Sequence, residues 1–423
     1  MAPRRAVEVA VVGAGPAGIA AALTLHDMGH TDVLVVDKAT FPRDKTCGDG
    51  LTTLALRELE RLGLRPADVA SWTEVSRTFI HAPSGHIVTL PFPSGTGSYA
   101  AIARRLDLDA ALVDLARSRG VEVVDGAALQ GAVDHGDHID LDVEGLGDIT
   151  ARWVVGADGM WSPLRRALGV NEPGYRGEWH AFRQYFCDVA PGARDLHVWF
   201  EPDLLPGYAW SFPLTGGRAN VGFGVIRGAH LDGKALARLW PELLDRPAIR
   251  RVLGAHARPE APHTAWPIPA SIDKATLHAG RALFVGDAAR ACDLMTGEGI
   301  GQALLTGRLV AEAIALPGAA DADACERYAA AVHHELDADH RTAALLNRAL
   351  SNRRITDASI RVVGTSQWTR RHFGRWLFED SPRGLALTPR RWRKGALSGP
   401  PAFVDDDIDA ADDGTASVTT GVR

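Results

Sequence analysis

Near its start the chain reads Val7-Glu-Val-Ala-Val-Val-Gly13-Ala-Gly15-Pro-Ala-Gly18. The nearly continuous apolar run before the first glycine predicts a strand that is buried on both faces. The glycine spacing suits a tight turn at Gly13, close approach of a pyrophosphate at Gly15, and close packing of a helix on the strand at Gly18. The small and apolar residues that follow predict a helix, whose N-terminus attracts phosphate.

A second apolar run over residues 33–36 ends in Asp37. A carboxylate at this distance from the glycines is placed to accept hydrogen bonds from a ribose. The whole segment therefore predicts a strand–helix–strand unit of the Rossmann type that binds a dinucleotide.

The composition excludes several classes of protein. With 423 residues, 46% of them hydrophobic, the chain is long enough for two large domains, and its pI near 6.2 gives no reason to expect a nucleic-acid partner. The four cysteines lie far apart without a CxxC pair, which fits a reducing cytoplasm and predicts no disulfide framework and no metal site. The sequence also leaves no room for a signal peptide before the first strand, and no apolar run approaches the roughly 20 residues of a membrane span.

The pattern of strands and helices changes along the chain. Aromatic residues and strand-like runs gather between residues 169 and 269, whereas helical periodicity dominates after residue 299. We predict an α/β fold, α+β overall, with a Rossmann-type domain, an inserted antiparallel-sheet domain and a C-terminal helical segment. The predicted bounds are 1–75, 100–168 and 270–330 for the Rossmann-type domain, 76–99 and 169–269 for the sheet domain, 331–397 for the helical segment and 398–423 for a disordered acidic tail.

Two further glycine-rich turns each follow a buried strand. The first is Gly156-Ala-Asp158-Gly159, and the second is Gly286-Asp287, followed by Gly297-Glu-Gly299 at a helix start. A loop carboxylate after a strand can hold a ribityl hydroxyl, and a glycine-rich helix start can present N–H groups and its dipole to a flavin ring. A simple nicotinamide dehydrogenase would need the first motif and little else.

These three motifs, together with Arg105 in the pattern Arg-x-x-Leu-Asp, resemble the flavoprotein superfamily of the para-hydroxybenzoate hydroxylase type, and within it the geranylgeranyl reductase family. The resemblance covers most of residues 5–320 and implies FAD as the cofactor. By this resemblance Arg105 and Asp287 contact the pyrophosphate and ribityl region, and Leu129 lies where the backbone usually contacts adenine. The full set of residues expected at FAD is Gly13, Gly15, Pro16, Ala17, Gly18, Asp37, Lys38, Arg43, Cys47, Gly48, Arg105, Leu129, Asp158, Gly159, Gly286, Asp287, Gly297, Gly299 and Ile300.

Two local motifs point to the reductase branch. The loop Cys47-Gly-Asp-Gly50 resembles the CxxG loop that lies beside the flavin in this family. Tyr208-x-Trp210-x-Phe212-Pro resembles the core of its PxxYxWxFP motif, which lines the substrate cavity, although Pro206 is one position closer to the tyrosine than in the family. In a strand these three rings alternate onto one face, as an aromatic wall for a lipophilic substrate requires. The alternative is that the rings form only the core of the inserted domain.

Cys47 and Leu294 leave the chemistry open. A buried, inert thiol is the default interpretation of Cys47, and the functional interpretation is a thiol beside the flavin whose pKa is lowered by Arg43 and Lys45 nearby. Leu294 stands where related enzymes commonly have a proline, in the loop before Gly297. This change weakens the transfer of a detailed mechanism from the family.

The sequence thus predicts an FAD-dependent reductase that delivers hydride to a carbon–carbon double bond of a lipophilic, prenyl-type substrate, with NADPH or NADH as a transient electron donor. A flavin-dependent monooxygenase acting on a hydrophobic aromatic or terpenoid is the main alternative. A halogenase fits the aromatic motif less well, and a flavin-binding scaffold without activity is a third possibility.

Residues 368–395 carry eight Arg or Lys and two acids, interleaved with three tryptophans. Such a segment is either a solvated helical face with its tryptophans turned inward or a contact with anionic lipid or with a pyrophosphate tail. We therefore expect a cytoplasmic protein in which this segment can make a peripheral membrane contact.

Overall fold

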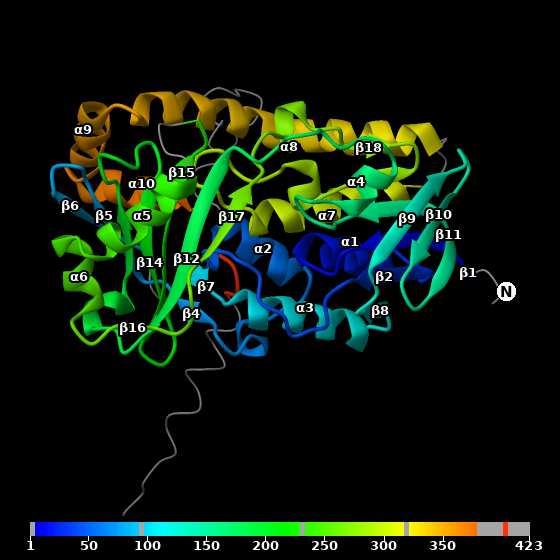
Figure 1. Cartoon of the computed structure of the whole chain (residues 1–423), viewed down its shortest axis with the longest axis horizontal. Helices are drawn as coiled ribbons and strands as arrows, with labels where there is room; N and C mark the ends of the chain where they lie inside the picture. Colours follow the sequence, from blue (N-terminus) through cyan, green and yellow to red (C-terminus); the bar gives the residue numbers. More distant parts are fainter. Residues whose placement is uncertain (1–4, 93–96, 229–232, 317–320, 379–400, 405–423) are drawn as a thin grey trace, which may run out of the picture.

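Two β-sheets lie side by side along the molecule, with the long helix α8 (Asp321–Leu350) running past both (Figure 1). The computed structural model describes residues 5–92, 97–228, 233–316, 321–378 and 401–404. α8 crosses residue 330, where we had placed the border between the first domain and the C-terminal helices.

The first sheet is the predicted Rossmann-type sheet. Its main path has the order β18-β19-β11-β1-β2-β8, and β10 and β9 extend it from β11. The pairings among β19, β11, β1, β2 and β8 are parallel, whereas β9, β10 and β18 pair antiparallel. The strands are β1 (Arg5–Val12), β2 (Val33–Asp37), β8 (Glu122–Asp125), β9 (Leu129–Asp134), β10 (Ile139–Val143), β11 (Gly147–Gly156), β18 (His278–Ala279) and β19 (Ala282–Phe284).

The topological switch point of this sheet lies at β1, which has β2 on one side and β11 on the other. The predicted buried strand is confirmed, because Val9 to Val12 are almost fully buried. Ligands of such sheets bind outside the carboxyl ends of the strands at the switch point. Both Gly13 and Asp158 follow strands that end there, so two motifs far apart in sequence meet at one place.

Helices cover this sheet and join it to the second one. α1 packs against both α7 and α3, and α7 also packs against α2 and α8. The small residues of α1 allow this close packing, since Ala20, Ala21 and Ala22 are completely buried. The helices are α1 (Pro16–Asp27), α2 (Thr53–Arg61), α3 (Arg105–Ser118), α4 (Pro163–Ala167) and α7 (Ile300–Ala315), and the 3₁₀ turns are η1 (Pro66–Asp68), η3 (Ile272–Lys274) and η4 (Gly286–Ala289).

The second sheet has the order β16-β12-β15-β14-β13-β5-β6, with β17 also paired to β12. Its pairings are antiparallel except that β13 and β5 run parallel. The parallel pair is possible because the β5–β6 hairpin comes from a separate stretch of chain. The strands are β5 (Arg77–His81), β6 (Ile87–Pro91), β12 (Trp179–Cys187), β13 (Leu196–Trp199), β14 (Tyr208–Leu214), β15 (Arg218–Ile226), β16 (Arg258–Pro259) and β17 (Thr264–Ile268). A small third sheet joins β3 (Gly50–Leu51), β7 (Ala101–Ile102) and β4 (Thr73–Glu74).

The inserted domain also contains two helices that the sequence analysis did not predict, α5 (Gly233–Leu244) and α6 (Pro247–Leu253), besides the 3₁₀ turn η2 (Pro191–Arg194). Leu236, Leu239, Trp240 and Leu243 of α5 are buried in one cluster with Phe182 and Phe223 of the sheet. Their spacing of three and four residues is the helical signal that the abundance of strands in this region concealed.

The C-terminal helices α9 (Arg353–Val363) and α10 (Gln367–Leu377) continue from α8 and pack against β6. Residues 379–395 of the basic segment lie outside the described residues. The predicted disordered tail is wrong at residues 401–404. Ala402 forms backbone hydrogen bonds with Ser98, and the buried Phe403 ring meets Trp72 edge-on at 5.7 Å. Ala402, Phe403 and Val404 form a short apolar run before the acidic end of the chain, and residues 398–400 and 405–423 of the predicted tail lie outside the described residues.

Candidate functional site

One cavity of about 810 Å³ joins the end of the first sheet to the face of the second. This volume falls in the range of small-molecule and cofactor sites. Every residue that we expected at FAD lines the cavity except Gly18, and the predicted substrate residues Tyr208, Trp210 and Phe212 line it too. The structure therefore brings the three glycine-rich motifs and the aromatic motif into one continuous site.

The glycines of the first motif leave room that a side chain would fill. Gly13 has a φ of +109°, and a Cβ on it would lie 2.3 Å from the carbonyl oxygen of Ala157. A Cβ on Gly18 would lie 1.8 Å from the carbonyl oxygen of Gly13, so this glycine allows α1 to pack on β1 beneath the cavity. A Cβ on Gly15 would meet only the guanidinium of Arg43, at 3.6 Å. The backbone at Gly15 is thus open to the cavity, as the approach of a pyrophosphate requires.

Two carboxylates stand at the ends of strands in this site. Asp37 accepts hydrogen bonds from the N–H groups of Ala14 and Ala39, at 2.7 and 2.8 Å, and so orders the glycine turn. Asp158 accepts one from the N–H of Leu164 at 2.9 Å, while its Oδ1 is buried and has no hydrogen-bond partner among the described residues. Burial raises the pKa of Asp158 to about 6. An orphaned carboxylate oxygen facing the cavity fits the hydroxyl-rich part of a dinucleotide.

Charged groups expected at the cofactor are paired within the protein in this structure. Arg105 donates two hydrogen bonds to the buried carboxylate of Asp109, at 2.7 and 2.6 Å. Lys45 donates to Asp287 at 2.9 Å. Burial acts to raise the pKa of Asp287, but Lys45, Cys292 and Arg105 together outweigh it and hold this pKa below the usual range.

The start of α7 shows its affinity for anions directly. The carboxylate of Glu298 accepts hydrogen bonds from the N–H groups of Ile300 and Gly301, at 2.9 and 3.2 Å. These N–H groups lie at the positive dipole end expected at the flavin ring, and in this structure they donate to Glu298.

Tyr208, Trp210 and Phe212 form a continuous aromatic wall along β14. Neighbouring ring centroids are 6.0 Å and 5.9 Å apart. Trp210 is 6% exposed, so it also belongs to the domain core, whereas Tyr208 and Phe212 are half-buried. Both earlier interpretations of the rings thus apply, because one side of the wall is packed and the other lines the cavity.

The Cys47–Gly50 loop lies directly against this wall. A Cβ on Gly48 would lie 3.5 Å from the ring of Phe212, and one on Gly50 would lie 3.3 Å from it. Burial raises the pKa of the Cys47 thiol, and the lowering influence of Arg105 and Lys45 does not offset it. The suggestion that nearby cations lower this pKa is therefore wrong, and the thiol is neutral at physiological pH.

The neutral state of Cys47 can be checked by alkylation. At neutral pH, iodoacetamide is expected to modify the half-buried Cys187 before Cys47, because only a thiolate reacts rapidly. Peptide mass spectrometry over a time course measures the order. Faster labelling of Cys47 than of Cys187 in the native protein would contradict the raised pKa.

Several hydrogen-bonding residues near the Cys47–Gly50 loop and the Leu294 loop were not predicted from the sequence. Asp49 is completely buried and accepts hydrogen bonds from Tyr185 and Asn220, and Trp179 donates from its indole to the carbonyl of Leu294 at 2.9 Å. Burial raises the pKa of Asp49 to about 6 against the effect of these donors. The one local signal was a carboxylate placed between Gly48 and Gly50.

The loop that carries Leu294 is held without the usual proline. Its carbonyl accepts hydrogen bonds from Trp179 and from Asn347 of α8, and Asp293 caps the turn through the N–H groups of Met295 and Thr296. The hydroxyl of Tyr208 donates to the carbonyl of Thr296. Side chains from the second sheet and from α8 therefore fix this loop.

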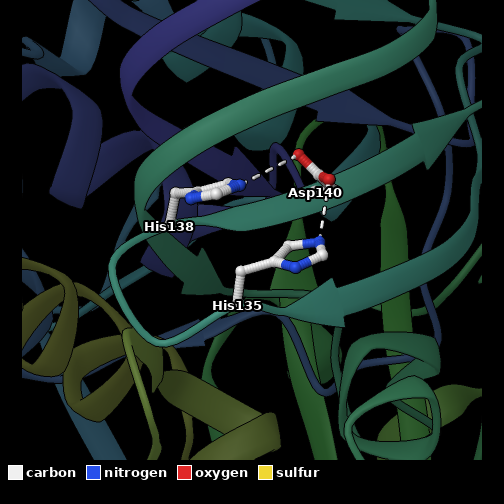
Figure 2. Close-up of side chains that lie close together, drawn as sticks. All are labelled: His135, His138 and Asp140. Atoms are coloured by element: carbon white, nitrogen blue, oxygen red, sulfur yellow. Dashed lines mark ion pairs between the residues drawn. The ribbon is translucent and has the colours of Figure 1, made fainter.

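Away from the cavity, His135, His138 and Asp140 converge at the hairpin between β9 and β10 (Figure 2). The Nε2 atoms of the histidines lie 2.9 and 3.8 Å from the two carboxylate oxygens of Asp140, and Thr150 donates to the same carboxylate. Arg281 binds the turn between them through the carbonyl of Gly136. The partners in this cluster satisfy one another, and we assign it no ligand.

Comparison with known proteins shows which family the chain resembles. A sequence model for the family described as FAD binding domain matches residues 6–336. The chain is 35% identical to menaquinone reductase of Mycobacterium tuberculosis over 325 residues, 72% of this chain and 76% of that protein. It is 33% identical to digeranylgeranylglycerophospholipid reductase 2 of Methanopyrus kandleri over 318 residues, 73% of this chain and 76% of the relative.

Solved structures show the same fold. A geranylgeranyl bacteriochlorophyll reductase-like protein of Thermoplasma acidophilum superposes with a TM-score of 0.74 at 20% identity, over 92% of this chain and 99% of that one. The p-nitrophenol 4-monooxygenase of Pseudomonas putida gives 0.71 at 18% identity, over 89% and 98%. Taken with the sequence relatives and the cavity, these matches mean that the chain belongs to the geranylgeranyl reductase family of FAD-dependent oxidoreductases, within the para-hydroxybenzoate hydroxylase-like flavoprotein superfamily.

Proposed function

We propose that this oxidoreductase reduces a carbon–carbon double bond in the prenyl chain of a lipophilic substrate. The observation that carries the proposal is the aromatic wall of β14, which lines the same cavity as the FAD motifs and faces the Cys47–Gly50 loop. The names of the sequence relatives, menaquinone reductase and digeranylgeranylglycerophospholipid reductase, agree with prenyl-bearing substrates.

Some residues of the chain would bind the cofactor, and others would hold the substrate and exclude water from the cavity. The backbone at Gly15 and the carboxylates of Asp37 and Asp158 would hold the dinucleotide end, and Arg105 and Asp287 would lie at its centre. FAD, when bound, supplies the hydride. The wall of Tyr208, Trp210 and Phe212 would hold an extended apolar chain and keep water out. The neutral thiol of Cys47, or a water, would supply the proton that completes addition across the double bond.

The electron donor belongs to the same proposal. The sequence holds no second Gly-x-Gly-x-x-Gly unit after a strand, so we propose that NADPH or NADH binds transiently rather than as a resident cofactor. Anaerobic mixing with each nucleotide, followed by loss of the oxidised flavin absorbance, identifies the donor. If dithionite reduces the flavin but neither NADPH nor NADH does, the proposal of a nicotinamide donor is contradicted.

One experiment, run without oxygen and then in air, separates the candidate functions. The reduced holoenzyme is mixed with a menaquinone or a geranylgeranyl lipid, and the flavin spectrum and product mass are followed. Reoxidation of the flavin is expected, with a product whose prenyl chain, located by fragment mass, is two hydrogens heavier. An oxygenated product formed only in air would favour the monooxygenase, and no substrate-dependent reoxidation in either condition would favour a scaffold.

We further propose that α9 and α10 meet the surface of an anionic membrane on the cytoplasmic side. Ile355, Val362 and Trp368 are 45%, 62% and 68% exposed, and the exposed arginines 353, 354, 361 and 371 surround them. Leu377 and Phe378, at the end of α10, line the cavity. Basic and aromatic residues beside a cavity lined by apolar residues suit an enzyme that takes its substrate from lipid. Among the described residues, no helix is long and apolar enough to cross a bilayer.

Vesicle sedimentation tests this surface. The protein is expected to bind vesicles that contain anionic phospholipid more than neutral ones, and W368A is expected to lower that binding severalfold. V133A is the matched control, because Val133 is 56% exposed but lies on β9 of the first sheet. Equal losses in the two variants, or no preference for anionic vesicles, would contradict the proposal.

A further inference from the structure

Asn220 occupies the centre of a hydrogen-bonded network between the two sides of the cavity. Its Nδ2 donates to the carbonyl of Cys47 at 2.9 Å and to the carboxylate of Asp49 at 2.8 Å. Its Oδ1 accepts from the indole N–H of Trp210 at 3.1 Å. One completely buried amide thus joins the Cys47–Gly50 loop to the middle ring of the aromatic wall.

Asp49 completes the network from the loop side. Tyr185 donates its hydroxyl to the carboxylate at 2.7 Å, and the N–H of Arg105 approaches its other oxygen at 3.3 Å. Asp49 also has a φ of +64°, a left-handed conformation that aspartate and asparagine accept more readily than most residues. The carboxylate therefore contacts β12, β15 and α3 at once.

The strand register explains why these groups meet. Asn220 pairs with Tyr185 of β12 on one side and with Phe212 of β14 on the other, so the three side chains share one face of the sheet. The amide orientation is fixed, because reversing it would direct its NH₂ group at the indole N–H and its oxygen at two acceptors.

We propose that Asn220 and Asp49 are positioning residues that set the distance between the flavin-facing loop and the substrate wall. A Cβ added to Gly48 or Gly50 would already lie 3.5 or 3.3 Å from the ring of Phe212, so a small shift of the loop changes the space left between loop and ring. This role rests on the proposed reductase function, since it concerns the gap in which hydride would cross. Neither residue is expected to touch the reacting atoms.

The test uses two single variants and a swap of the pair. N220L removes all three bonds of the amide. D49N can keep an oxygen toward Asn220 and Tyr185, but its NH₂ group then faces the N–H of Arg105. In the double variant D49N/N220D, the amide at position 49 donates to the carboxylate at position 220, which still accepts from Trp210. The bond to the carbonyl of Cys47 is lost, and the hydroxyl of Tyr185 no longer donates to position 49. If N220L fails to fold, D49N and the swap keep the test intact.

The matched control is Q184L. Gln184 is a buried amide on the same strand as Tyr185, and it accepts from the indole of Trp240 at 3.1 Å and donates to the carbonyl of Ala261. It links a tryptophan to the sheet in the same way, but it does not line the cavity. The Q184L variant therefore measures the effect of breaking an amide–indole hydrogen bond that lies away from the cavity.

Three measurements are made on each holoenzyme: the visible circular dichroism of bound FAD without substrate, the rate of reduction by dithionite, and the rate of flavin reoxidation by the prenyl substrate. D49N and N220L are expected to change the dichroism and to slow substrate-dependent reoxidation about ten- to a hundredfold, with dithionite reduction unchanged. The double variant D49N/N220D is expected to restore most of the dichroism and most of the reoxidation rate, and Q184L is expected to change neither quantity.

Visible dichroism in D49N and N220L that matches Q184L would overturn the proposal, as would a swap that restores nothing. Because the dichroism is recorded without substrate, it tests the network even if the wild-type enzyme reduces no prenyl compound. That second result would overturn the proposed function alone.

Discussion

Replacing Arg105 by methionine is expected to lower the free energy of unfolding by about 3–5 kcal/mol. The guanidinium holds the carboxylate of Asp109 through two short hydrogen bonds, and both side chains are almost completely buried. Removing the cation leaves a buried charge that, within the described part of the chain, only Arg43, 2.9 Å away, still neutralises. Urea denaturation of R105M measures the loss, and R65M, which breaks the exposed pair with Asp68, is expected to cost less than about 1 kcal/mol.

The double variant R105M/D109L separates the structural role of Arg105 from its role at FAD. Without the buried carboxylate, the double variant is expected to recover most of the lost stability. It is still expected to bind FAD weakly, because Arg105 would be missing from the pyrophosphate. Wild-type flavin content in the double variant would show that Arg105 serves only to hold Asp109.

Truncating Phe212 to alanine is expected to lower kcat/KM for a prenyl substrate about ten- to a hundredfold while flavin content stays unchanged. An apolar ring buried against substrate contributes about 1.5–3 kcal/mol, and each 1.4 kcal/mol changes the rate or the affinity about tenfold. The ring lies at the edge of the cavity against Gly48 and Gly50. Steady-state kinetics with the substrate found above, and the flavin-to-protein absorbance ratio, measure the two quantities.

Two further variants define what the Phe212 ring does. F212L keeps most of the volume and is expected to retain most activity if the wall acts by shape and exclusion of water. F79A removes a half-buried ring from the same sheet away from the cavity, where Phe79 stacks on His197. Similar kinetic losses in F79A and F212A would mean that the sheet, rather than the wall, is responsible.

The features that could be predicted from the sequence are those that depend on the spacing of residues close together in the chain. The apolar run before Gly13 and the glycine intervals identified the first sheet, and the alternation of Tyr208, Trp210 and Phe212 identified the wall. Each of these signals lies within a few residues, where strand and turn geometry act directly. The two later glycine turns were recognised for the same reason.

What the sequence could not predict depends on contacts between distant segments. Asp49 meets Asn220 across 171 residues and Tyr185 across 136, and no periodicity records such a meeting. The burial of Phe403 at the end of the chain is of the same kind. The sequence left two interpretations of Cys47 open, and the choice between them depends on burial, which the sequence does not show.

The parallel pairing of β5 with β13 has a consequence for synthesis of the chain. β5 and β6 are complete by Pro91, but their partner strand begins only at Leu196. At about 5–20 residues per second, the ribosome needs roughly 5–20 s to make the intervening stretch. During that time the hairpin edge that will join β13 has no partner strand. The Rossmann-type sheet needs β19, which follows all strands of the second sheet in the chain, so its set of strands is completed last.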